Sequence, residues 1–144
     1  MPSRLEAIIR SLTRRRRVAL ALWVALLCWA ATILALSSLT PDELPGPAFW
    51  FWDKLNHVLA FAVGGWLAAR ALRLSRPDLP VAPVLVAAVV MIAAFGALDE
   101  TIQTLTPGRN GGDSRDWFAD VIGAIGGAML SLYRAPRLPR RPPD

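Results

Sequence analysis

The sequence has little of the chemistry that builds disulfide frameworks or cysteine–histidine metal sites. It contains one cysteine, Cys28, and one histidine, His57. A single cysteine excludes an intrachain disulfide, and Cys28 lies in an apolar stretch where it acts as a small hydrophobic residue. One histidine with several carboxylates falls short of the usual zinc ligand set. The sequence therefore predicts no metal and no cofactor.

Charge is absent from long stretches of the chain. Residues 18–40 carry no charged side chain, and 54% of the 144 residues are hydrophobic. At about 1.5 Å per residue, a helix over this run crosses the roughly 30 Å of bilayer hydrocarbon. A cleaved signal peptide is the alternative, since Ala35-Leu36-Ser37 follows the run. Because signal-peptide apolar regions are only about 7–15 residues long, we favour an uncleaved first span.

Three further apolar stretches follow, at residues 53–72, 79–98 and 116–133. The second span holds one ionisable residue, His57, between Lys54 and Arg70, and the fourth is interrupted by Asp120. Blocks of this kind are typical of membrane proteins rather than of a soluble core. We therefore predict an all-α integral membrane bundle of four transmembrane helices.

The chain is expected to divide into three segments. Residues 1–17 form a cytoplasmic amphipathic and basic segment, with a short surface helix over residues 3–13 that precedes four arginines. Residues 18–133 form the four-helix membrane domain. Residues 134–144 form a disordered basic tail, because arginine and proline dominate it. The aromatic residues at 49–52 are typical of the membrane–water interface.

Basic residues predict the orientation of the bundle. All of the 16 lysines and arginines except Lys54, Arg109 and Arg115 lie in the N-terminal segment, the loop after the second span or the tail. The positive-inside rule then places both termini in the cytoplasm of a multi-pass protein of the cytoplasmic membrane. The run from Arg14 to Arg17 also matches a nucleic-acid patch, but it adjoins a span, so we expect a membrane anchor and no nucleic-acid partner.

Three short polar groups stand at the predicted outer ends of the second, third and fourth spans. They consist of Asp53, Lys54 and His57; Glu100, Gln103, Pro107 and Arg109; and Asp116, Asp120 and Gly123. Spacings of three and four residues place Asp53 with His57 on one helix face, and Glu100 with Gln103 on another. Asp116, Asp120 and Gly123 share a face of the fourth span, whereas Arg109 begins the loop after Pro107. Ionisable side chains at membrane depth usually face the bundle interior and pair with one another. His57, Glu100 and Asp120 are the best candidates for such pairing.

Several of these residues have a structural alternative. Asp53 and Asp116 are suited to cap the second and fourth helices, because aspartate is favoured at helix N-termini. The Gly123-x-x-x-Gly127 spacing lets another helix approach closely, either within the bundle or in a homo-oligomer. The glycine-rich loop that begins at Arg109 has a composition that could cradle a phosphate.

In this order, the polar groups resemble the VanZ-like family. The resemblance covers roughly residues 50 to 130 and rests on Asp-Lys-x-x-His, on Glu-x-x-Gln with Pro-x-Arg, and on Asp with Asp-x-x-Gly. It departs from the family pattern in two places: Asp120 stands where an amide is common, and the stretch between Arg109 and Asp116 is about one residue longer. The resemblance implies a small polytopic membrane protein, and the founding member of the family is linked to teicoplanin resistance. The resemblance does not imply a particular chemical reaction.

Three functions of different classes remain open. The first is binding of an anionic cell-envelope or lipid-linked ligand at the extracytoplasmic face, which could affect glycopeptide susceptibility. Its expected binding residues are Asp53, Lys54, His57, Glu100, Gln103, Arg109, Asp116 and Asp120. The second is a hydrolase or transferase acting on a lipid head group, with His57 as base or nucleophile and Glu100 or Asp120 as acid. The third is a proton-coupled transporter or an accessory subunit, since acids and histidine within spans suit proton relays.

Overall fold

The computed structural model describes residues 4–44 and 53–133, and this part of the chain contains helices and no strand. The helices are α1 (Arg4–Ser37), the short 3-10 helix η1 (Pro41–Glu43), α3 (Asp53–Ser75), α4 (Val81–Leu105) and α5 (Ser114–Tyr133). The predicted all-α class is confirmed. The predictions for the aromatic stretch 49–52 and the tail 134–144 lie outside the described residues, and so does the side chain of Asp53.

Three of these helices are long and apolar enough to cross a membrane. They cover Ile8–Ser37, Lys54–Ser75 and Val81–Leu105. The fourth predicted span corresponds to α5, which is not among the three. This helix is 20 residues long, and its apolar character is diluted by glycines and by charges such as Asp116 and Asp120. Three apolar helices of this kind indicate a membrane-embedded protein.

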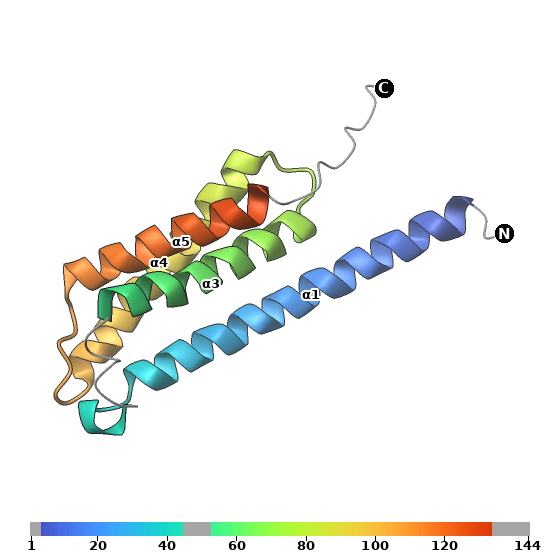
Figure 1. Cartoon of the computed structure of the whole chain (residues 1–144). Coiled ribbons are helices and arrows are strands. Elements are labelled where there is room, and N and C mark those ends of the chain that lie inside the picture. Colours follow the sequence, from blue (N-terminus) through green and yellow to red (C-terminus); the bar gives the residue numbers. More distant parts are fainter. Residues whose placement is uncertain (1–3, 45–52, 134–144) are drawn as a thin grey trace.

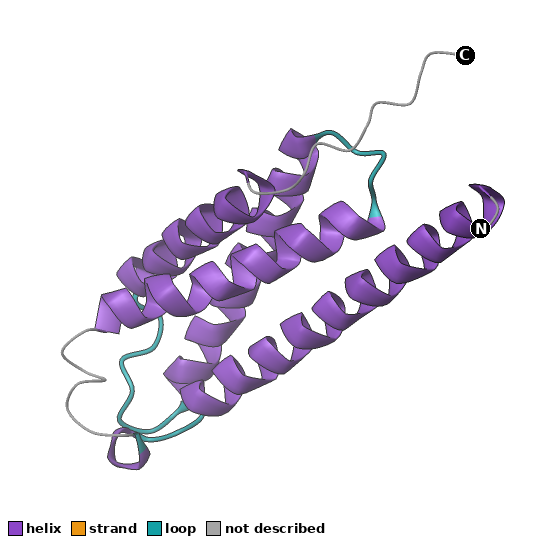
Figure 2. Ribbon diagram, turned by 45° about the vertical axis from the view of Figure 1, so that its right-hand side comes forward, coloured by secondary structure: helices purple, strands orange, loops and turns teal. Residues whose placement is uncertain are grey.

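The helices run alternately up and down, so that the ends of α1 and α4 lie beside the starts of α3 and α5 (Figure 1). We call this end of the bundle the polar end. Helix α5 packs most extensively against α3 and then against α4, whereas α1 contacts mainly α3. Figure 2 shows the same arrangement from a second direction, with α1 along one side of the other three helices.

Helix α1 differs from the prediction. A separate surface helix over residues 3–13 was expected, but the structure has one continuous helix of 34 residues from Arg4 to Ser37. The arginine run causes no break because arginine is a good helix former, and the segment contains no glycine or proline. The N-terminal part of α1 therefore extends beyond the ends of the neighbouring helices (Figure 1).

Small residues hold α3 and α5 close together. A methyl group added to Gly123 would meet the backbone of Val58, and one added to Gly127 would meet the backbone of Ala62. Gly65 of α3 faces the backbone of Ala124 in the same way. The glycine face is thus occupied by α3 of the same chain, which is the internal-packing alternative of the two that the spacing left open. Many large apolar side chains instead point outward, as expected of lipid-facing helices.

Candidate functional site

The polar end brings together side chains from all four long helices and from the loop before α5. Predicted site residues at this end are Lys54, His57, Glu100, Gln103, Arg109, Asp116 and Asp120. Asp53 begins α3 at the same end. The side-chain contacts at this end form three sets, and a backbone hydrogen bond from Asp113 to Glu100 links the first two.

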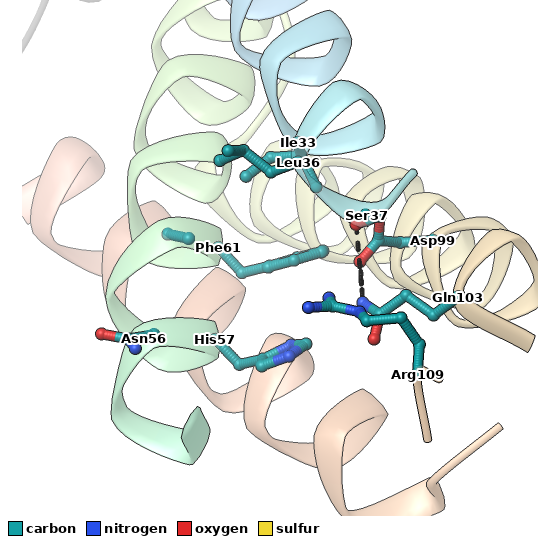
Figure 3. Close-up of a pocket in the computed structure, with 10 residues that line it drawn as sticks. Ile33, Leu36, Ser37, Asn56, His57, Phe61, Asp99, Gln103 and Arg109 are labelled. Atoms are coloured by element: carbon teal, nitrogen blue, oxygen red, sulfur yellow. Dashed lines mark hydrogen bonds between the residues drawn. The ribbon is translucent and has the colours of Figure 1, made fainter. Parts of the chain in front are cut away.

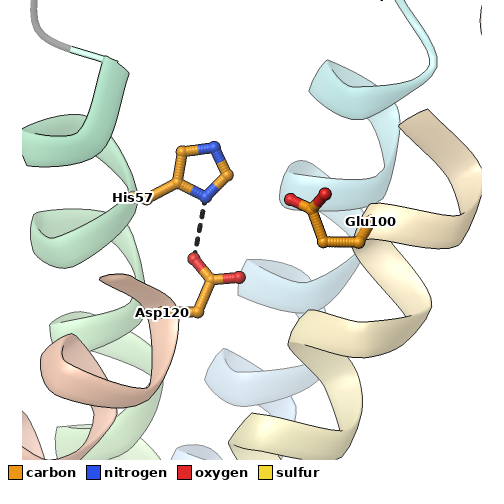
Figure 4. A group of neighbouring side chains, drawn as sticks. All are labelled: His57, Glu100 and Asp120. Carbon is orange, nitrogen blue, oxygen red and sulfur yellow. Dashed lines mark hydrogen bonds and ion pairs between the residues drawn. The ribbon is translucent and has the colours of Figure 1, made fainter. Parts of the chain in front are cut away.

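The first set is the triad of His57, Glu100 and Asp120 (Figure 4). The three residues come from α3, α4 and α5, and one ligand atom of each lies within 4.8 Å of the other two. Nδ1 of His57 lies 2.8 Å from Oδ1 of Asp120, and the histidine side chain is 12% exposed. Asp120 is fully buried at 0% exposure, and Glu100 is 6% exposed. The predicted pairing of His57 with Asp120 is confirmed.

Two carboxylate oxygens of the triad have no hydrogen-bond partner in the described part of the chain. They are Oε1 of Glu100 and Oδ2 of Asp120. The other oxygen of Glu100, Oε2, accepts a hydrogen bond of 3.0 Å from the backbone N–H of Asp113. Space for Asp120 comes from Gly96 of α4, because a methyl group there would lie 2.9 Å from Oδ2. The triad is therefore tightly enclosed, although two of its carboxylate oxygens lack a hydrogen bond from the described residues.

The second set is an ion-pair group at the start of α5. The ammonium of Lys54 pairs with Asp116, and its Nζ also lies 3.3 Å from Oδ2 of Asp113. Asp113 caps the helix, since its Oδ1 accepts a 2.8 Å hydrogen bond from the N–H of Arg115. That N–H, together with Lys54, holds the pKa of Asp113 below its ordinary value. The capping role expected of Asp116 thus belongs to Asp113, three residues earlier.

The third set joins α1 to α4, and only one of its members, Gln103, was predicted as a site residue. The hydroxyl of Ser37 donates a 2.5 Å hydrogen bond to Asp99, and Gln103 donates a 2.9 Å bond to the other oxygen of the same carboxylate. Thr106 adds a 3.0 Å bond to the backbone oxygen of Ser37. Asp99 is 1% exposed. The available signal was that Asp99 and Gln103 stand four apart near the end of an apolar span.

A cavity of about 80 Å³ opens between these groups (Figure 3). Its polar lining consists of Ser37, Asn56, His57, Asp99, Gln103 and Arg109, and its apolar lining of Ile33, Leu36, Ala60 and Phe61. Arg109 reaches it from the loop after α4 (Figure 3). Within the described residues, the guanidinium makes no ion pair within 4.0 Å and no hydrogen bond. Lys54, which was expected alongside Arg109 among the residues that bind an anionic ligand, does not line this cavity.

A second hollow lies between α4 and α5. This groove has a volume of about 420 Å³, and Glu100, Thr104, Asp113 and Trp117 are among its lining residues. The glycine-rich loop folds against it, because a methyl group on Gly111 would meet the backbone of Thr104. Gly111 therefore serves close packing on α4, whereas Gly112 has a left-handed backbone conformation with φ 76° that favours glycine. Together, the cavity and the groove reach the triad from two sides, through His57 and Glu100.

Among the described residues, the polar end offers a guanidinium without an ion pair at the cavity, one histidine–carboxylate pair and two buried carboxylate oxygens without hydrogen-bond partners. Comparison with known proteins adds no assignment, since no protein-family model, curated protein or solved structure matches the chain.

Proposed function

We propose that the chain is a VanZ-like integral membrane protein whose polar end binds an anionic amphiphile of the cell envelope. In this proposal, α5 is the fourth span, both termini are cytoplasmic and the polar end faces outward. The described arginines of α1 and of the loop after α3 lie at the opposite end, which supports that orientation. A ligand would be a lipid-linked phosphate or a drug with a lipid tail.

The observation that carries the proposal is the position of Arg109. A guanidinium that makes no ion pair with the described residues and lines a partly enclosed cavity is suited to bind a phosphate or carboxylate through two parallel hydrogen bonds. Gln103 and Asn56 line the same cavity. The amide of Gln103 already donates to Asp99 and Ser37, so it holds the cavity wall in place beside the guanidinium. Lys54 is committed to Asp113 and Asp116, so its role is to hold the start of α5 in place.

The shape of the cavity indicates how the rest of the ligand is placed. A volume of about 80 Å³ suffices for an anionic group but not for a whole lipid. Ile33, Leu36 and Ala60 continue the cavity wall along α1 and α3. Both helices expose apolar side chains along their outer surfaces. An acyl or prenyl chain attached to the bound group would therefore lie against these helices within the bilayer.

The test compares ligand binding by purified wild type, Arg109→Ala and Arg115→Ala. Arg115 is a matched control because it is an exposed arginine six residues away, outside the cavity lining. A labelled lipid phosphate is the probe, and a neutral lipid with the same tail is its comparison. We expect Arg109→Ala to lose about 1.5–3 kcal/mol of binding free energy, the value of hydrogen bonds to charged groups, and Arg115→Ala to bind normally. Equal binding by all three proteins would refute the proposal.

A catalytic role for His57 is the second candidate. It is favoured by the 2.8 Å contact between Nδ1 and Asp120, because a buried carboxylate on one ring nitrogen orients the imidazole to act as a general base through the other. Loss of head-group hydrolysis in a folded His57→Gln variant would support this role, and unchanged cellular function would argue against it. A change in teicoplanin susceptibility that depends on Arg109 but not on His57 would favour binding alone.

A further inference from the structure

We propose that His57, Glu100 and Asp120 form a binding site for one divalent transition-metal ion of the zinc class. The three residues come from three helices, and their ligand atoms lie within 4.8 Å of one another. This proposal does not rest on the anion site, because Arg109 is not a member of the triad. It revises the expectation from the sequence that one histidine is too few for a metal site.

The spacing of the three groups is close to what a metal requires. Zinc binds imidazole nitrogen and carboxylate oxygen at about 2.0–2.2 Å, which places neighbouring ligand atoms roughly 3–3.5 Å apart. A separation of at most 4.8 Å is closed by small rotations of the carboxylate groups. The helices supply the remainder of the arrangement, because α3, α4 and α5 are packed tightly through glycine contacts at this depth.

Unsatisfied oxygens provide an independent reason to place a cation here. Oε1 of Glu100 and Oδ2 of Asp120 are both buried and have no hydrogen-bond partner in the described part of the chain. Burying a carboxylate oxygen without a partner is costly, and the usual solutions are a hydrogen bond, an opposite charge or a metal. A cation held between the two carboxylates would satisfy both oxygens at once.

The ligand types select the class of ion. An imidazole nitrogen with two carboxylate oxygens suits zinc, manganese or iron(II), whereas calcium and magnesium prefer ligand sets made only of oxygen. Metal ligation requires an unprotonated ring nitrogen. An ion that takes Nδ1 of His57 therefore replaces the contact with Asp120, and a proton on that nitrogen would be released on binding.

Access to the triad exists from both sides. Glu100 lines the α4–α5 groove and His57 lines the cavity that contains Arg109. Three protein ligands leave a coordination position for water or for a ligand group, as in catalytic zinc sites. An anionic group bound at Arg109 would lie in the cavity that also reaches His57, so an ion in the triad would add positive charge near it.

The test uses zinc and copper as probes on the full-length protein, purified in detergent through a tag without histidine. His57 is the sole histidine of the chain. Nitrogen modulation in pulsed electron paramagnetic resonance of bound Cu²⁺ therefore reports ligation by His57 without any substitution. Isothermal titration calorimetry with Zn²⁺ measures affinity. We expect one ion per chain and an imidazole signal from the bound copper.

Substitutions then test the two carboxylates. Glu100→Gln and Asp120→Asn keep the shape of each side chain and are expected to weaken zinc binding by at least the roughly 10–100-fold seen when an outer partner of a metal ligand is removed. Asp113→Asn is the matched control: it lies at the same end, keeps the helix cap and leaves the backbone bond to Glu100 in place. Absence of the imidazole signal, or equal zinc affinity in all four proteins, would overturn the proposal. If Asp120→Asn fails to fold, the wild-type spectrum and Glu100→Gln still decide it.

Discussion

Nδ1 of His57 and Oδ1 of Asp120 lie 2.8 Å apart and join α3 to α5 at the polar end of the bundle. Gly123 stands one turn further along α5, where its backbone contacts Val58 of α3. The polar contact and the glycine contact are thus parts of one interface. The same close approach that packs the two helices brings the imidazole to the carboxylate.

This pair should be energetically coupled. Asp120→Ala and His57→Ala each leave a buried polar group without the partner of the 2.8 Å contact, so each single change should cost about 1–3 kcal/mol of unfolding free energy. The double variant should cost less than the sum of the two, with a coupling of about 1–2 kcal/mol. The unfolding free energy of wild type and of the three variants is measured by titrating each protein from mixed micelles into denaturing detergent. Circular dichroism follows the loss of helix. Additive losses would show that the 2.8 Å contact contributes nothing.

The glycines of α5 allow a comparison within one helix. A methyl group on Gly127 would meet the backbone of Ala62, whereas one on Gly126 would meet nothing within 4 Å. Gly127→Ala should therefore destabilise the bundle by about 1–3 kcal/mol through overpacking. Gly126→Ala should stabilise it by about 0.5–1 kcal/mol, because alanine loses less backbone entropy in a helix. The same detergent titration applies. Equal effects at the two positions would contradict the α3–α5 packing.

The ion pairs of Lys54 should matter more than an exposed pair at the other end of the bundle. Lys54→Met leaves the carboxylate of Asp116, whose side chain is only 7% exposed, without its cation. We expect a loss of about 1–2 kcal/mol, because a largely buried carboxylate is left unpaired. Arg76→Met breaks an exposed pair with Asp78 and should cost less than about 0.5 kcal/mol. Thermal unfolding of the two variants gives this comparison. Equal losses would show that the ion pairs of Lys54 stabilise the protein no more than an exposed ion pair does.

Much of the fold followed from the distribution of apolar and charged residues. Helices α3 and α5 begin and end within three residues of the predicted spans. Helix α4 continues seven residues beyond its predicted span, to Leu105, because the polar stretch after Leu98 contains no proline or glycine to end the helix. The convergence of His57, Glu100 and Asp120 was also predicted, since buried ionisable groups must find one another. These inferences needed only local patterns and the alternation of the spans.

The contacts that the sequence did not predict depend on which face of each helix packs against which neighbouring helix. Asp99 and Glu100 are neighbours in the sequence, but consecutive helix residues point about 100° apart. Asp99 therefore contacts Ser37 of α1, while Glu100 turns towards the triad and the α5 loop. No periodicity in one helix reveals this difference. Likewise, only the folded loop shows that Lys54 meets Asp113 and that Arg109 enters the cavity.

The proposed orientation predicts which loops are reachable from outside the cell. Cys28 is the sole native cysteine, so Cys28→Ala provides a background for single new cysteines. Asn110→Cys lies in the exposed loop before α5, and Asp78→Cys in the exposed loop between α3 and α4. A membrane-impermeant maleimide should label Asn110→Cys in intact cells and Asp78→Cys only after permeabilisation, because the two loops lie at opposite ends of α4.

The fourth span is tested by one further position. Arg137→Cys stands after α5, so it should behave like Asp78→Cys if α5 crosses the bilayer. The physical reason is that α5, at about 1.5 Å per residue, reaches about 30 Å and has its charged residues in its first two turns. Labelling of Arg137→Cys in intact cells, with Asp78→Cys still protected, would mean that α5 returns to the outer face. The bundle would then have three spans, and α5 would lie against α3 without crossing the membrane.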